Sequence, residues 1–391
     1  MKYLLILLIV AFTALKSFAQ NTFLPTKTYL GHNQRAIKYK DQKQYLKSAL
    51  SFDSLFKANK GNGVTRDKYI ASTSWALAGN PDKAFRYLAQ YLKEIQTFHL
   101  EFLDQDEELK SLHPDPRWQP LINQSKAKIQ RAILKYKPLD TLVDVDTHKL
   151  FFNIIKGSST VILFETGGMD NSTVWSDILI PIHEATGATL ITYDRAGYGH
   201  STRDSINSDI TNEIIGLEMG LSKLGYTDAN KILVCHSLGG FYVTLYAARN
   251  PEKVKAAVFI DASLGSFYTD EAIQRVLTNP NGSIEEIKKK NTSIYYIAVD
   301  LHKNAATLRA TSFPIQIPIT DIYAGTPPWD DQIDIEGWKD GHKKFIAARP
   351  NSKLIFAEGT THYVGADNPQ LVINEIIKSY KATVSGSLVE K

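Results

Sequence analysis

Residues Lys231–Gly240 read KILVCHSLGG, and this stretch decides the fold of the larger part of the chain. Apolar residues typical of a buried strand come first, and the two final glycines open a helical pattern. Ser237 therefore lies at a sharp strand-to-helix turn, which holds a serine in a strained conformation with its hydroxyl exposed. The residues two before and two after it must be small, because strand and helix pass close together there. Gly239 meets this requirement, and the small side chain of Cys235 stands where glycine is usual.

The chemistry that such a turn favours is nucleophilic attack by the serine. A serine hydroxyl is a poor nucleophile near neutral pH unless a base removes its proton as it attacks. In this geometry the backbone N–H of Leu238 points to the place where an oxyanion would form. The sequence therefore predicts an activated serine with an oxyanion donor beside it.

Around this turn, the chain after residue 138 alternates short strands with helices. This alternation predicts an α/β fold with an eight-stranded, mostly parallel sheet covered by helices. The helical stripe between the fourth and fifth strands runs from Ile210 to Leu224. Residues 264–312 interrupt the sheet with a largely helical segment, the place where a cap or lid would lie. The expected strands are Leu142–Val145, Lys149–Ile155, Val161–Phe164, Thr189–Tyr193, Lys231–Cys235, Val254–Ile260, Ile317–Ala324 and Lys353–Phe356.

Three further stretches share a pattern with known enzymes. Phe164–Gly168 (FETGG) leaves a strand as an oxyanion loop does, Tyr193–Ser201 (YDRAGYGHS) matches a D-x-x-G-x-G-x-S turn, and Thr361–Tyr363 (THY) follows the last strand. With the Ser237 turn, these motifs stand in the order found in the α/β-hydrolase superfamily, which residues 140–380 resemble. The departures are Cys235 for glycine and Thr166 where many members have histidine.

The resemblance implies a serine hydrolase with defined roles for its residues. Ser237 would be the nucleophile, and His362, on the loop beyond the last strand, would be the base and then the acid. The neighbouring His236 leaves the turn in a different direction, so we do not expect it to be the base. The oxyanion donors would be the N–H groups of Gly168 and Leu238.

The acid that orients His362 has two candidates. The family usually places it just after the strand that here ends near Ala324, but the sequence there reads GTPPW, and Asp330 comes two residues late. Asp261 ends the preceding strand, a position that some members use. We prefer Asp261 and keep Asp330 as the alternative.

The rest of the predicted site is apolar. Four side chains are expected to line a substrate pocket: Met169, Trp175, Phe241 and Trp329. The glycines form neither a P-loop nor a dinucleotide fingerprint, and no histidine pair has metal-ligand spacing. We therefore predict no cofactor and no metal, and a small-molecule acyl substrate.

The front of the chain, residues 20–137, has helical spacing throughout and predicts a small all-α domain. Tyr69–Leu92 resembles a tetratricopeptide-type helical hairpin, with its turn at Gly79-Asn80 and small residues such as Ala84. One such unit makes little concave surface, so we favour a structural appendage over a protein-binding groove.

The composition places few limits beyond these. The 391 residues carry 45 Lys+Arg against 41 Asp+Glu, which gives no electrostatic case for nucleic-acid binding. A single cysteine excludes an intramolecular disulfide.

The sequence also predicts the nature of the two ends of the chain. Residues 1–19 combine Lys2, an apolar run too short to span a bilayer, and small residues at 17 and 19. This pattern predicts a signal peptide cleaved before Gln20 and a secreted or periplasmic protein without a membrane segment after cleavage. The hydrolase domain would span residues 138–381, and residues 382–391 would form a flexible tail.

Two hypotheses of function follow from the sequence. The first is an exported serine hydrolase that cleaves a carboxylic ester, or a related acyl bond, through an acyl-enzyme. The second is a catalytically inactive α/β-hydrolase fold that binds a partner through the helical domain. The co-occurrence of Ser237, His362 and both oxyanion loops favours the first.

Overall fold

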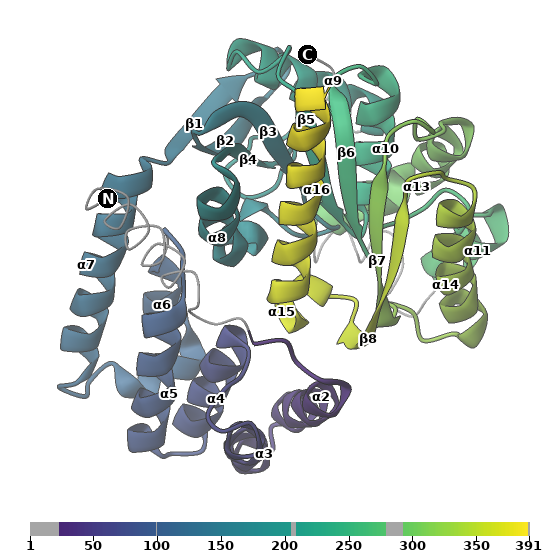
Figure 1. The fold of residues 1–391 in the computed structure, drawn as a ribbon. Coiled ribbons are helices and arrows are strands. Elements are labelled where there is room, and N and C mark those ends of the chain that lie inside the picture. Colours follow the sequence, from purple (N-terminus) through teal and green to yellow (C-terminus); the bar gives the residue numbers. More distant parts are fainter. Residues whose placement is uncertain (1–22, 99, 205–208, 279–291, 390–391) are drawn as a thin grey trace, which may run out of the picture. The chain divides into compact units, whose positions relative to one another are not determined.

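The computed structural model describes residues 23–98, 100–204, 209–278 and 292–389, in two compact units (Figure 1). The first unit is helical and extends to Ile95, with His99–Lys128. The second comprises Gln96–Phe98 and Ile129–Lys391. The predicted signal peptide and its cleavage site lie outside the described residues. Among the described helices, none is long and apolar enough to cross a membrane.

Helices make up the first unit. The pair α4 and α5 packs as a hairpin, because Gly79 adopts a φ of 77° that ends α4 and Asn80 caps α5 by accepting from the Lys83 N–H. Pro81 takes the first helical position, as the sequence predicts. The tetratricopeptide relationship stays a prediction. The helices are α2 (Lys27–Asp41), α3 (Tyr45–Ala58), α4 (Thr65–Leu77), α5 (Pro81–Glu94), α6 (Glu101–Gln105) and the 3-10 turn η1 (Glu107–Leu112), and α7 (Trp118–Tyr136) passes into the second unit.

The second unit is built on one eight-stranded sheet in the order β1-β2-β4-β3-β5-β6-β7-β8. β2 runs antiparallel to both β1 and β4, and the other neighbours are parallel. The predicted fold class is therefore confirmed. The strands are β1 (Leu139–Asp144), β2 (Lys149–Ile155), β3 (Ser158–Glu165), β4 (Ala188–Asp194), β5 (Lys231–His236), β6 (Val254–Ile260), β7 (Ile319–Thr326) and β8 (Lys353–Thr361).

Helices cover both faces of the sheet, because the central strands are apolar on both sides. On β5, Leu233 and Cys235 belong to one core, whereas Ile232 and Val234 belong to the other. Helices α9 (Ile210–Lys223), α10 (Gly239–Arg249) and α14 (Gln332–Ala347) pack on the first face, and α8 (Ser176–Thr186) and α16 (Pro369–Val389) pack on the second (Figure 1).

The segment predicted as a cap is helical where it is described. Helices α11 (Asp270–Thr278) and α13 (Thr292–Ala310) lie between β6 and β7 in the sequence, and residues 279–291 between them lie outside the described residues. The end of the chain differs from its prediction, since α16 continues to Val389 where a tail from 382 was expected. Apolar residues continue at helical spacing beyond residue 382, and Ala382 itself favours a helix. The spacing runs through Ile373, Ile376, Ile377 and Val384, so the sequence contains no signal that ends the helix at 382.

Candidate active site

Ser237 lies at the turn between β5 and α10 with a φ of 51°, a conformation that costs a residue with a side chain roughly 1–2 kcal/mol. Neighbouring backbone holds it there: its N–H donates to Ile260 O (3.2 Å), and its carbonyl accepts from Ser263 N (2.7 Å). The close approach explains the glycines. A Cβ on Gly240 would lie 2.3 Å from Ser263 O, and one on Gly239 would lie 2.8 Å from Thr166 O. Cys235 is buried in the core beneath α10, and burial raises the pKa of its thiol.

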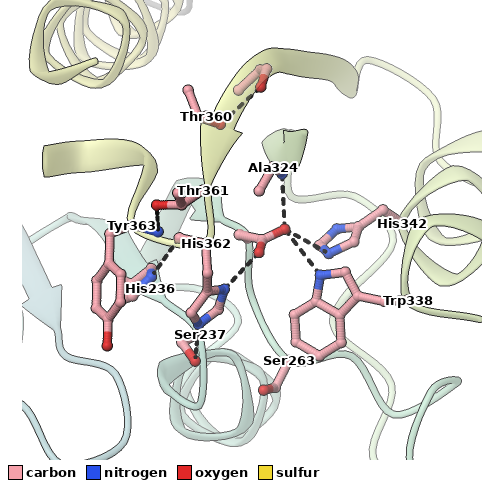
Figure 2. A network of polar contacts seen from close by, with 12 residues as sticks. His236, Ser237, Ser263, Ala324, Trp338, His342, Thr360, Thr361, His362 and Tyr363 are labelled. Atoms are coloured by element: carbon pink, nitrogen blue, oxygen red, sulfur yellow. Dashed lines mark hydrogen bonds and ion pairs between the residues drawn. The ribbon is translucent and has the colours of Figure 1, made fainter. Parts of the chain in front are cut away.

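A chain of hydrogen bonds joins Ser237, His362 and Asp261 (Figure 2). The Ser237 Oγ lies 2.8 Å from His362 Nε2, and His362 Nδ1 lies 2.6 Å from Asp261 Oδ2. His362 directly follows β8, and Asp261 directly follows β6. The structure thus brings together the serine, the histidine and the preferred acid. The alternative acid, Asp330, is exposed, and the carboxylate bonded to His362 is that of Asp261.

The Asp261 carboxylate is buried and receives donors on both oxygens. Its Oδ1 accepts from Ala324 N and from Trp338 Nε1, each at 2.9 Å (Figure 2). Burial opposes ionisation of this carboxyl, but the hydrogen bond and the charge of His362 outweigh it and hold its pKa below its usual range. Asp261 therefore stays ionised and fixes the direction of the His362 ring.

Behind Asp261 lies a second buried acid–imidazole pair. His342 Nδ1 bonds to Asp321 Oδ2 at 2.7 Å, and His342 Nε2 lies 3.8 Å from Asp261 Oδ1. Burial disfavours the imidazolium, but the charges of both carboxylates raise the pKa of His342. Sequence reasoning missed Trp338 and His342. They are four residues apart on α14 and therefore lie on the same face of that helix. The spacing predicts this shared face, but it does not predict that the face packs against Asp261.

His236 is not placed to act as the base. Its Nε2 bonds to the backbone oxygen of His362 at 3.0 Å, and burial lowers its pKa to about 4. The ring is therefore neutral and supports the loop that carries His362, as expected from its direction at the turn.

The loop after β3 lies against the serine turn. A Cβ on Gly167 would be 3.3 Å from the Ser237 Cβ, and one on Gly168 would be 3.5 Å from Leu238 Cδ2. In the described part of the chain, the backbone N–H groups of Gly168 and Leu238 donate no hydrogen bond. Two unpaired donors next to the serine form an arrangement that can bind an oxyanion.

Arg195, from the loop after β4, holds the loop after β3 through its backbone carbonyls. Its guanidinium is buried and bonds to Glu165 Oε1 (2.6 Å), Thr166 O (2.8 Å) and Gly167 O (2.5 Å). The Tyr193 hydroxyl also donates to Glu165. Asp194 has the structural role that its glycine-rich turn suggests, because it accepts from the N–H groups of Ser172 and His200.

The predicted pocket residues are not gathered in one place. Phe241 lines a cavity of about 320 Å³ that begins at Leu238. Trp175 instead packs on Phe164 in the core on the opposite face of the sheet, and Trp329 stacks on Phe267 at 5.0 Å between ring centroids. Met169 is 56% exposed with a φ of 67°. Trp175 and Trp329 therefore pack in cores away from the serine, whereas Phe241 packs against Tyr268 in a core and also lines the cavity.

Within the described ranges, no group of three or more His, Cys, Asp or Glu side chains is arranged to bind a metal ion.

Comparison with known proteins supports the fold. Residues 160–292 match the alpha/beta hydrolase fold family. The chain is 27% identical over 175 residues to the 2-(acetamidomethylene)succinate hydrolase of Mesorhizobium japonicum, a match that covers 43% of this chain and 60% of that enzyme.

The chain is also similar to proteins of known structure. The bromoperoxidase from Bacillus anthracis has a TM-score of 0.47 at 18% identity, covering 62% of this chain and 100% of its own. The alpha/beta hydrolase domain-containing protein 10 from mouse has a TM-score of 0.49 at 18% identity, and the match covers 63% of this chain and 99% of the mouse chain. The sheet topology and the family match together assign the α/β-hydrolase fold to the second unit and support a hydrolase.

Proposed function

We propose that the protein is a serine hydrolase that cleaves a carboxylic ester, or a related acyl bond, through an acyl-enzyme. The observation that carries this proposal is the hydrogen-bonded chain from Ser237 Oγ through His362 to the ionised Asp261. A hydrolase reaction is also what the sequence match to 2-(acetamidomethylene)succinate hydrolase supports.

Each step of the proposed reaction has a residue to perform it. As Ser237 Oγ attacks the substrate carbonyl, His362 Nε2 takes its proton, and Asp261 stabilises the imidazolium that forms. The carbonyl oxygen becomes an oxyanion that the Gly168 and Leu238 N–H groups bind. His362 then gives the proton to the leaving oxygen, and water attacks the acyl-enzyme by the same route in reverse.

The test needs no knowledge of the substrate. A fluorophosphonate probe should label wild-type protein and fail to label Ser237→Ala or His362→Ala. Asp261→Asn should lower ester hydrolysis by about 10⁴-fold, because the amide holds the wrong imidazole tautomer. Asp330→Asn is the matched control and should retain activity. A folded wild-type protein that the probe leaves unlabelled would contradict the proposal and favour the inactive, partner-binding alternative.

We also propose export, on the pattern of residues 1–19 alone. Cell fractionation with N-terminal sequencing tests this: a mature protein that begins at Gln20 outside the cytoplasm is expected, and an intact Met1 in the cytoplasm would contradict it.

A further inference from the structure

Two buried carboxylates lie close together behind the proposed catalytic serine. Asp261 directly follows β6, Asp321 lies on the neighbouring strand β7, and both side chains are fully shielded from solvent. Water does not screen like charges at this depth, so both carboxylates stay ionised only where a proton or a positive charge compensates them. His342 of α14 joins the two, because its Nδ1 is 2.7 Å from Asp321 Oδ2 and its Nε2 is 3.8 Å from Asp261 Oδ1 (Figure 2).

The hydrogen bond between His342 and Asp321 limits where the protons of this pair can lie. Nδ1 and the Asp321 carboxyl share one proton, whichever of the two atoms holds it. If the pair has no other proton, it is negative, and the Nε2 lone pair faces the Asp261 carboxylate. If Nε2 carries a second proton, the pair is neutral overall, and an N–H faces Asp261. Burial favours the second state, because an uncompensated charge inside the protein is costly.

The surroundings of His342 leave this compensation to the two carboxylates. Burial lowers the pKa of His342, but the charges of Asp321 and Asp261 outweigh burial and raise it. The ring of Tyr323, also on β7, stacks on the imidazole at 5.8 Å between centroids. Apart from Asp334, the charged side chains of α14 are at least partly exposed. On the elements that contact α14, Arg275 of α11 bonds to Asp334, Lys353 of β8 bonds to Glu375, and Glu358 of β8 is exposed.

We propose that His342 is a positioning residue for the serine machinery: held by Asp321, it directs its Nε2–H at Asp261 and keeps that carboxylate ionised. The inference rests on the proposed hydrolase function and deepens it, because it concerns the acid that orients His362. When His362 takes the proton of Ser237, the imidazolium needs a negative partner that does not itself accept the proton. An N–H behind Asp261 makes the carboxylate less basic, so the proton stays on His362 and remains available to the leaving oxygen.

The kinetic test compares the pH dependence of kcat/KM for p-nitrophenyl acetate in wild-type protein and in His342→Phe. Without the N–H behind it, Asp261 becomes more basic and the His362 imidazolium more stable, so the pKa of each should rise. The acid limb of the profile should therefore move to higher pH by about one unit. A residue that only supports packing would lower the rate at every pH without moving the limb.

His148→Phe is the matched control for this profile. His148 belongs to another buried acid–imidazole pair of the second unit, 3.5 Å from Asp204 Oδ2, and it packs against Gly216 of α9. The substitution should leave the acid limb in place. An acid limb that stays unmoved in His342→Phe, or moves to lower pH, would overturn the inference.

A measurement without turnover separates this inference from the hydrolase proposal and needs no variant to fold. In wild-type protein labelled with ¹⁵N-histidine and assigned by triple-resonance NMR, His342 Nε2 should carry a bonded proton at neutral pH. An Nε2 without a proton would contradict the inference even in an active esterase. A protonated Nε2 in protein that hydrolyses no ester would support the inferred proton and remove the hydrolase proposal.

Discussion

Trp338 donates one of the hydrogen bonds that the buried Asp261 carboxylate receives. Its indole N–H is one of two donors to Asp261 Oδ1, and the ring is 2% exposed. Trp338→Phe should therefore raise the pKa of Asp261, lower kcat and cost about 1–3 kcal/mol of stability. Because the folded-state pKa is depressed, the stability from ionised Asp261 is present above its usual pKa and is lost as pH falls through the folded value. Denaturant titrations should thus show the largest decrease in the free energy of unfolding of Trp338→Phe, relative to wild type, near neutral pH.

The neighbouring Trp329 provides a matched control for that measurement. Its ring lies 5.7 Å from Trp338, and its buried Nε1 has no partner among the described residues. Trp329→Phe removes the same volume without removing a hydrogen bond, so it should cost less and leave kcat near wild type. Equal effects of the two substitutions would show that packing, and not the bond to Asp261, is what matters.

The buried Glu213 carboxyl gives the folding stability a pH dependence. Burial raises its pKa to about 7; Arg195 and the Tyr242 hydrogen bond oppose this shift, whereas Glu165 and Asp209 add to it. The carboxyl is therefore more readily ionised when the chain is unfolded, and folding stability falls as pH rises from about 4.5 to about 7. Glu213→Gln should be more stable than wild type by about 1–2 kcal/mol at pH 8, a difference that shrinks toward pH 5.

At the scale of elements, the serine turn depends on close contact between β5, α10 and the strand end that carries Asp261. Gly240→Ala would place a Cβ 2.3 Å from Ser263 O, a backbone atom that cannot move aside alone. The substitution should cost about 1–3 kcal/mol and lower fluorophosphonate labelling by displacing the loop after Asp261. Gly365→Ala, where nothing lies within 4 Å, is the control and should melt and label as wild type does.

The elements of the sheet were predictable because their signal is local. Each strand is a short β-branched or apolar run bounded by turn residues, and all eight expected strands form. Boundaries shifted where backbone chemistry intervened: β7 begins at Ile319, since Pro318 cannot donate to a ladder. Trp338, His342 and Asp321 could not be assigned, because their convergence on Asp261 is made by the packing of α14 on the sheet. The sequence favoured Asp261 over Asp330 only slightly, because both are aspartates near strand ends, and the tertiary structure shows that Asp261 is the one bonded to His362.

At the scale of the whole molecule, every residue of the proposed machinery lies in the second unit. A chain that begins at Pro116 keeps all of α7 and the sheet, so it should fold and accept the fluorophosphonate probe. It loses Phe98, which belongs to a core of the second unit, and should be less stable by about 2–4 kcal/mol. Phe98→Ala in the full chain isolates that loss and should lower the melting temperature by a similar amount. A folded truncated chain that the probe does not label would show that the helical part is needed for activity.

The hydrogen bond from Arg195 to the Gly167 carbonyl also orients a second backbone group, because the peptide group is planar. The carbonyl of Gly167 and the N–H of Gly168 belong to a single trans peptide unit and point in opposite directions. By holding that carbonyl, the arginine also fixes the orientation of the N–H on the other side of the same peptide unit. Rotating this amide plane would break a charge-assisted bond inside the protein, where water is not available to replace it. The proposed oxyanion donor is thus oriented in the resting protein, before any substrate binds.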